Sequence, residues 1–167
     1  MVRAITLLLF FSLLSCSLFA GDNLITLQTK GSGSTITIKQ VGNSNTTGVY
    51  CGLGSFDNSL VGTHNCNNAT ITSTVTGNSN VVYSQSVWSN HTGQSWITTV
   101  DGNDNYAVID MDESDNVSTI IQNGDDNQAW ILGSGDDNVY KIEQSGDDYY
   151  AKIYAFSDDS DVWITQE

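Results

Sequence analysis

The sequence lacks proline and has very few cationic side chains. Its 167 residues include 5 Lys and Arg together, 2 His and 3 Cys. Nucleic-acid binding requires clustered cations that neutralise phosphates, so nucleic acid is not an expected partner. G-x-S-x-G, H-E-x-x-H and P-loop motifs are also missing, and only His64 and His91 could serve as imidazole bases. We therefore expect that this protein is not an enzyme, and we assign no catalytic residue.

Long apolar runs are confined to the first twenty residues. Arg3 precedes a run from Ile5 to Leu14, and small residues follow, with Ala20 just before Gly21. This order is typical of a secretory signal peptide, so we expect residues 1–20 to be removed and residues 21–167 to form the secreted domain. No other stretch is long enough to cross a bilayer, so no membrane span is expected.

The chain that remains after cleavage has two cysteines and a large negative charge. Cys51 and Cys66 are the two cysteines left after cleavage, and in an exported protein we expect them to form a disulfide. Neither a CxxC motif nor a Cys/His spacing typical of zinc is present. Four Lys and nineteen acidic residues give 4 − 19 = −15, and seventeen of the acids lie in residues 101–167.

An eleven-residue repeat fills most of this chain. From Ser95 the units follow one another without insertion, and the last is cut short at Glu167. The N-terminal half shows the same unit at 24–34, 35–45, 59–69 and 70–80, while 46–58 and 81–94 carry insertions of two and three residues. We count thirteen units on this basis, with an irregular, insertion-bearing part at about 46–94.

Each unit predicts a strand of about six residues and a turn of about five. Positions 2, 4 and 6 fall on one face of a strand, because side chains alternate across it. Position 8 is often Gly and position 11 often Asn, which tolerate the positive φ of a tight turn. Position 4 supplies the expected core column: Ile38, Ile109, Ile120, Ile131, Ile142, Ile153 and Ile164.

Two units make one coil of 22 residues. Gln122, Gln144 and Gln166 are spaced by 22 and share a face, as parallel in-register stacking about 4.8 Å apart requires. The prediction is an all-β solenoid of about six turns, with two parallel sheets facing each other and stacked amide ladders. Polar or small residues at position 4 in the middle of the chain predict looser structure there: Gly62, Ser73, Ser84 and Thr98. His64 is expected at an inward position 6.

The repeat residues resemble a known family. Gln40, Gly42 and Asn45 follow Ser34 as S-x5-Q-x-G-x2-N, and the Q-x-G-x2-N half recurs later in the chain. This pattern is similar to the curlin repeat of curli fibre subunits, and it is carried by Gln122, Gly124, Asn127, Asn138, Gln144, Gly146 and Gln166 as well.

The resemblance implies a structural subunit of a secreted extracellular amyloid fibre at the cell surface, in the biofilm matrix. Its partners would be copies of itself, assembled head to tail, together with a nucleator and with secretion or chaperone factors. Two other roles stay open. One is a soluble surface-binding solenoid, adhesive or ice-binding, since threonine rows start at Thr35 and Thr70. The other is a minor nucleating subunit of such a fibre.

The turns of the C-terminal half are acidic, and three interpretations compete. They could be a solvated edge that slows premature assembly, a set of Ca²⁺ ligands, or an adaptation to high salt. No defined calcium motif is present, and no other cofactor is expected. The possible calcium ligands are Asp125, Asp126, Asp136, Asp137, Asp147 and Asp148. The outward aromatic residues could mediate lateral fibre contacts or bind ligands, or they could pack across strands, which is the interpretation we favour. Lys152 is expected over Trp130 as a cation–π pair.

Overall fold

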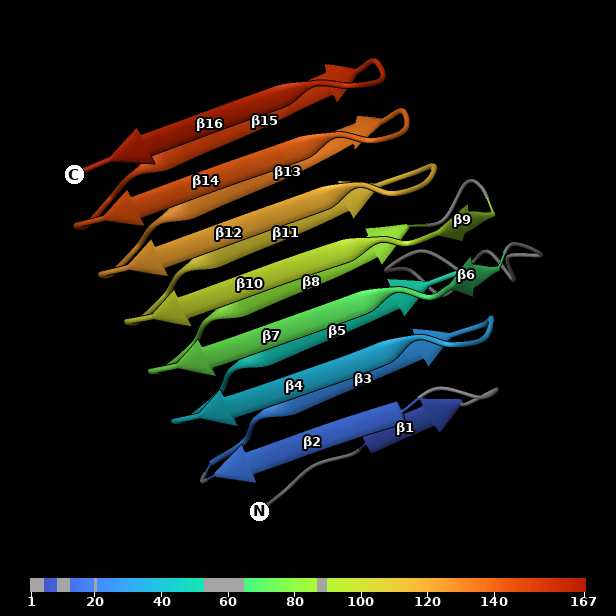
Figure 1. The fold of residues 1–167 in the computed structure, drawn as a ribbon. Coiled ribbons are helices and arrows are strands. Elements are labelled where there is room, and N and C mark those ends of the chain that lie inside the picture. The colour runs from blue at the N-terminus through green and yellow to red at the C-terminus, as the bar shows by residue number, and fades with distance from the viewer. Residues whose placement is uncertain (1–4, 9–12, 20, 53–64, 87–89) are drawn as a thin grey trace.

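A computed structural model describes residues 5–8, 13–19, 21–52, 65–86 and 90–167. All regular structure in these residues is β-strand, and the strands wind into a parallel β-solenoid (Figure 1). Residues 24–166 contribute six strands to each of two facing sheets, so the coil has six turns there. The predicted fold class is therefore confirmed.

The two sheets contain alternate strands of the chain. The first sheet consists of β1 (Ile5–Leu8), β3 (Leu24–Thr29), β5 (Thr46–Cys51), β8 (Val81–Ser86), β11 (Tyr106–Met111), β13 (Gln128–Ser134) and β15 (Tyr150–Phe156). The second consists of β2 (Leu13–Phe19), β4 (Thr35–Val41), β7 (Thr70–Thr76), β10 (Ser95–Asp101), β12 (Val117–Asn123), β14 (Val139–Ser145) and β16 (Asp161–Gln166). A small third sheet pairs β6 (Cys66–Asn67) with β9 (His91–Thr92).

Strand register shows where the repeat is interrupted. Tyr106 pairs with Gln128 and Gln128 with Tyr150, which is the predicted spacing of 22. Thr35 pairs directly with Thr70, a spacing of 35, so no strand lies between β4 and β7, where the repeat predicts the unit at 59–69. The count of thirteen units is therefore wrong. The turn after β5 holds a 13-residue insertion (35 − 22), and the turn after β8 holds three, since Val81 pairs with Tyr106.

The middle of the coil keeps its register in spite of these insertions. Strands β5 and β8 pair over six positions, and β7 and β10 over seven. Ser73, Ser84 and Thr98 are buried at position 4 in the same interior columns as the isoleucines. The expected looseness therefore does not extend to these strands. Gly62 and His64 lie outside the described residues.

The turns depend on Gly at position 8 and on a left-handed residue at position 10. Gly124 has a φ of 128°, and a Cβ there would overlap the carbonyl oxygen of Gly146 in the next turn. Asp126 has a φ of 59°, in the left-handed region that Asp and Asn tolerate better than most residues. Asn127, at position 11, does not adopt a positive φ, so the explanation that Asn is needed at this position for a left-handed backbone is wrong.

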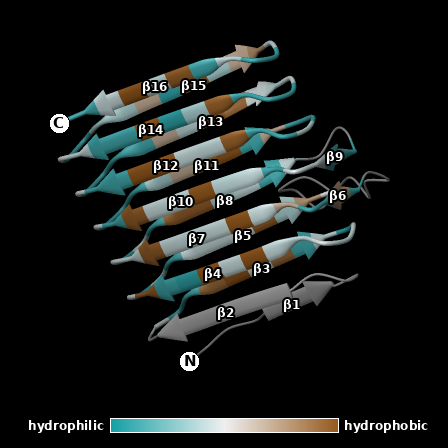
Figure 2. Ribbon diagram, viewed as in Figure 1, coloured by the Kyte–Doolittle hydropathy of each residue, from teal (hydrophilic) through white to brown (hydrophobic). Residues whose placement is uncertain are grey.

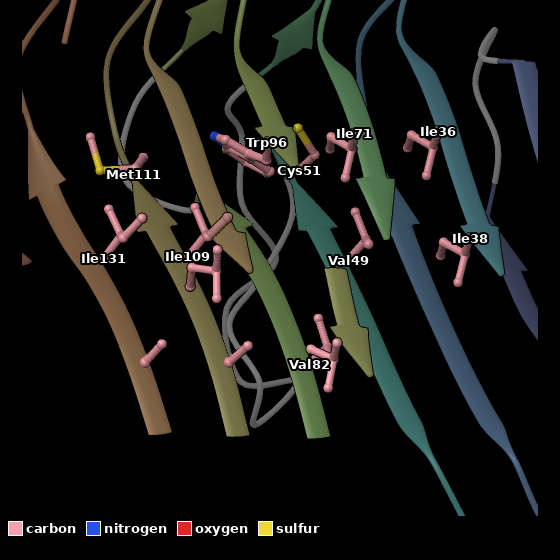
Figure 3. Close-up of a cluster of buried hydrophobic side chains, with 14 of the residues drawn as sticks. Ile36, Ile38, Val49, Cys51, Ile71, Val82, Trp96, Ile109, Met111 and Ile131 are labelled. Carbon is pink, nitrogen blue, oxygen red and sulfur yellow. The ribbon is translucent and has the colours of Figure 1, made fainter. Parts of the chain in front are cut away.

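The core consists of aliphatic columns between the two sheets. Ile109, Ile131 and Ile153 pair in register in the first sheet and are between 0 and 4% exposed. Figure 3 shows the side chains of Ile109 and Ile131 on neighbouring strands. Ile120, Ile142 and Ile164 form the corresponding column of the second sheet, where Ile38 holds the same position in β4. Figure 2 shows apolar segments, in brown, on successive strands of the coil.

Strands β1 and β2 lie inside the predicted signal peptide. They pair in register with β3 and β4, from Ile5 opposite Ile25 to Phe19 opposite Val41. Cleavage after residue 20 stays a prediction. If it occurs, β3 and β4 become the N-terminal edge of the coil, and Leu24–Val41 becomes its first turn.

Candidate assembly interface

A glutamine ladder runs along the interior of the second sheet. The Nε2 of Gln122 donates to Oε1 of Gln144 at 3.1 Å, and the Nε2 of Gln144 donates to Oε1 of Gln166 at 2.9 Å. Gln122 and Gln144 are fully buried, and the ladder hydrogen bonds offset the cost of burying their amides. Gln122 begins this run: its Oε1 accepts no hydrogen bond from the described residues, because its register partner on the N-terminal side is Val100. The ladder has a polarity, since every Nε2 points toward the C-terminal end of the coil.

Gln40 occupies the same position near the N-terminal end. Val75 and Val100 separate it from Gln122 in the register of the sheet. Its Nε2 donates to Thr47 Oγ1 at 2.7 Å, toward the C-terminal side. Its Oε1 is buried and accepts no hydrogen bond from the residues that the structure describes. The acceptor side of the ladder is therefore open at Gln40.

Asparagine at position 11 forms two further ladders, one at each edge of the coil. Asn45 Oδ1 accepts from the N–H of Asn80 at 3.0 Å, and Asn127 Oδ1 from that of Tyr149 at 3.0 Å. At the opposite edge, Asn138 Oδ1 accepts from the N–H of Ser160 at 2.8 Å. On the Asn45 edge the side-chain amides also donate to the glycine carbonyl oxygens of the next turn, as Asn45 does to Gly77 and Asn127 to Gly146. Asn is thus required for its side chain rather than for its backbone conformation.

The C-terminal end of the coil has no covering element among the described residues. Strand β16 pairs with β14 on one side only. Ile142 and Tyr140 are fully buried, whereas Ile164 and Val162, which continue their columns, are only partly buried. An uncovered strand edge with an apolar column behind it is a template for further pairing.

The acidic turns fall on two separate edges. Asp125, Asp126, Asp147 and Asp148 lie at the turns that follow the second sheet, whereas Asp136 and Asp137 lie at the opposite edge. Position-9 carboxylates are anchored by backbone: the N–H of Asp125 donates to Asp147 Oδ1 at 2.8 Å, and that of Asp136 to Asp158 Oδ1 at 3.0 Å. The pKa of Asp126 is raised, mainly by desolvation and also by the negative charges of Asp104 and Asp148.

Outward aromatic residues pack along the first sheet. Tyr106 and Trp130 have ring centroids 5.4 Å apart, and Trp130 and Tyr150 5.1 Å apart, as the predicted cross-strand packing requires. Lys152 is the register partner of Trp130, but its Nζ lies 5.2 Å from the ring centroid of Tyr154. The predicted Lys152–Trp130 cation–π pair is therefore wrong in its aromatic partner.

A shallow cavity of about 270 Å³ opens on the outer face of the first sheet. Asp110 and Asp112 line one part of it, and Tyr154 and Phe156 another. Burial of the carboxyl group raises the pKa of Asp110 to about 6, against a hydrogen bond from Gln85 that lowers it. The alternating pattern gave no signal for this site, because Asp110 occupies an ordinary outward position.

The two insertions bring cysteine and histidine together. Cys51 and Cys66 form a disulfide, and their Cα atoms are 5.4 Å apart. One imidazole nitrogen of His91 lies within 4.8 Å of both sulfur atoms, and all three residues are buried. In the described part of the chain this is the only such group of three or more, and the predicted calcium ligands form none.

No helix among the described residues is long and apolar enough to span a membrane. Comparisons of the chain with protein-family models, with curated proteins and with solved structures find no significant match. The likeness to curli subunits therefore depends on the repeat residues themselves and on the coil that they form.

Proposed function

We propose that this protein is a structural subunit of a secreted, curli-like extracellular amyloid fibre, in which copies stack end to end by strand templating. The observation that carries the proposal is the match between the two ends of the coil. Strand β16 leaves one edge without a strand partner, and β3 and β4 become the other edge once residues 1–20 are removed.

The register of the two ends is compatible residue by residue. Placed one turn beyond β16, strand β4 of a second copy sets Ile36 over Val162, Ile38 over Ile164 and Gln40 over Gln166. The same shift sets β3 over β15, with Ile25 over Ala151 and Leu27 over Ile153. Each interior column would then continue from one copy into the next at the usual strand spacing of about 4.8 Å.

The amide ladder gives the joint a direction. Gln166 accepts a hydrogen bond from Gln144 through its Oε1, which leaves its Nε2 as the donor for a further copy. Gln40 has a buried Oε1 that accepts no hydrogen bond from described residues. A Gln166-to-Gln40 hydrogen bond between copies would satisfy both groups, which a buried joint requires. A head-to-head or tail-to-tail joint would place two donors or two acceptors together.

Charge favours the same arrangement. The last turns of the coil carry Asp147, Asp148, Asp158 and Asp159, whereas the first turn after the predicted cleavage, residues 24–45, has no acidic residue and carries Lys30 and Lys39. Stacking two acidic ends would bring carboxylates within a Debye length of one another, where repulsion is little screened. Stacking an acidic end on a neutral or cationic end avoids this cost, and such unclosed contacts produce filaments.

A pair of end-blocking variants tests the proposal. Ile164→Asp places a charge in the apolar column at the C-terminal end, and Ile38→Asp does so at the N-terminal end. Each variant alone should fail to form fibres, because every joint needs both ends. An equimolar mixture should form dimers, because each variant keeps one intact end, and these two ends match.

Thr165→Asp is the matched control, since Thr165 is an exposed neighbour of Ile164 on the same strand. This variant should still form thioflavin-positive fibres. Analytical ultracentrifugation and negative-stain microscopy provide the readouts. Dimers of either variant alone would indicate a symmetric joint and refute head-to-tail stacking. A wild-type chain that stays monomeric through prolonged seeding would favour a soluble surface-binding solenoid instead.

A further inference from the structure

The Cys51–Cys66–His91 cluster is a product of the two insertions in the coil. The insertion after β5 contains Cys66, and the insertion after β8 contains His91; both lie in short strands that pair with each other. Cys66 is the direct register partner of His91, while Cys51 is the register partner of Ser86. The pair Cys66–His91 and the pair Cys51–Ser86 therefore meet in the interior, at the edge of the coil where the insertions lie.

The three side chains match the ligand set of a zinc site. Zinc is held by thiolate sulfur at about 2.3 Å and by imidazole nitrogen at about 2.0–2.1 Å. For tetrahedral coordination these lengths place ligand atoms about 3.5–3.8 Å apart. The two sulfur atoms and one nitrogen of His91 all lie within 4.8 Å of one another. Opening the disulfide and a small adjustment of the side chains would reach that geometry.

A hydrogen-bond chain fixes the imidazole. Ser86 Oγ donates to Asp112 Oδ1 at 2.9 Å, and Ser86 Oγ also lies 3.2 Å from His91 Nδ1. Because the single hydroxyl proton is donated to Asp112, the contact with His91 requires Nδ1–H to donate to Ser86 Oγ. Nε2 is then the lone-pair nitrogen. Histidine ligands of metals are oriented in this way by a second hydrogen-bond partner.

We propose that the reduced protein binds one Zn²⁺ ion through Cys51, Cys66 and His91, and that oxidation to the disulfide releases it. Reduction by a phosphine and water converts the disulfide to two thiols and the phosphine to its oxide. Zinc then replaces one proton on each thiol, so two protons are released for each ion bound. The same insertion is thus held to β5 by a metal under reducing conditions and by a disulfide under oxidising conditions.

Metal titration of the purified chain tests this inference. With a phosphine reductant, Zn²⁺ should bind at one ion per chain in competition with a chromogenic chelator, and Co²⁺ should give a thiolate charge-transfer band. The oxidised chain should show neither signal. Ser86→Ala, which removes the orienting hydroxyl, should weaken Zn²⁺ binding by about 10- to 100-fold. His91→Gln, which removes a ligand, should weaken it further.

The matched control is the double variant Asp125→Asn, Asp126→Asn, which removes turn carboxylates far from the cluster and should keep the wild-type affinity. Far-UV circular dichroism of each oxidised variant checks that the coil is formed. Equal affinity of wild-type protein and His91→Gln would overturn the proposal. So would binding by the oxidised chain, or failure of the reduced chain to bind Zn²⁺. Fibre formation is measured separately, and its failure would leave the metal result unaffected.

Discussion

Replacing Ile131 by alanine should remove a large part of the stability of the coil. Ile131 is fully buried between Ile109 and Ile153 in a column whose spacing is fixed by backbone hydrogen bonds. Loss of three carbon atoms at about 0.8 kcal/mol each gives about 2.4 kcal/mol. The strands cannot close the gap, so a cavity cost is added, and we expect about 3–4 kcal/mol in total.

Urea unfolding of freshly prepared monomer, followed by far-UV circular dichroism, measures this effect. With a slope of about 2–3 kcal/mol per molar urea, the unfolding midpoint should fall by about 1–2 M. The control is Leu132→Ala, the adjacent outward residue, whose side chain is only half-buried and should cost about 1 kcal/mol or less. Equal losses for the two variants would refute the assignment of Ile131 to the interior column.

Three further results are expected. Gly124→Ala should lower the free energy of unfolding by at least about 1–3 kcal/mol in urea titrations, because the new Cβ would overlap the Gly146 carbonyl and φ is 128°; no loss would show that this turn is wrongly placed. The raised pKa of Asp110, about 6 against 3.8, means that the folded chain binds more protons between these values, so stability should increase as pH falls from 7 to 4. Asp110→Asn should flatten that increase in the urea midpoint, and an unchanged slope would contradict the assignment. The Cys51–Cys66 disulfide closes a loop of 15 residues, so the double variant Cys51→Ser, Cys66→Ser should lose about 3 kcal/mol of unfolding free energy, measured by thermal unfolding. A loss below about 0.5 kcal/mol would indicate that the cross-link does little to restrain the unfolded chain.

Much of the fold is predictable because every turn repeats the same local chemistry. The 22-residue spacing of Gln122, Gln144 and Gln166 is enough to predict parallel in-register stacking. The recurrence of isoleucine at position 4, within strands whose side chains alternate between two faces, likewise identifies the interior columns. These features depend on residues close in sequence or at a constant spacing, so a single sequence contains all the information needed.

The middle of the chain could not be predicted in the same way. Residues 59–69 have the length of a repeat unit, and length alone does not distinguish a stacked strand from an insertion in a turn. Only the pairing of Thr35 with Thr70 shows that no strand from this segment lies between β4 and β7. The Cys–Cys–His cluster could not be predicted for the same reason, because Cys66 and His91 are brought together by the pairing of β6 with β9, which lie in the two insertions. No Cys/His spacing in the sequence indicates it.

The position-11 asparagines show a different limit. Frequency of Asn in turns predicts a left-handed backbone, but the left-handed residue is the preceding Asp or Ser. Asn is instead buried, where its amide bridges successive turns. The composition of a turn does not reveal which of its residues bends the chain and which provides the side-chain ladder.

The joint between subunits is the central claim, and a high-resolution cryo-electron microscopy structure of the assembled fibre tests it most directly. We predict β4 of one copy stacked in parallel on β16 of its neighbour, with Gln40 opposite Gln166 and Ile38 opposite Ile164 at about 4.8 Å. Fibres in which these residues face solvent, or in which two C-terminal ends meet, would contradict the account.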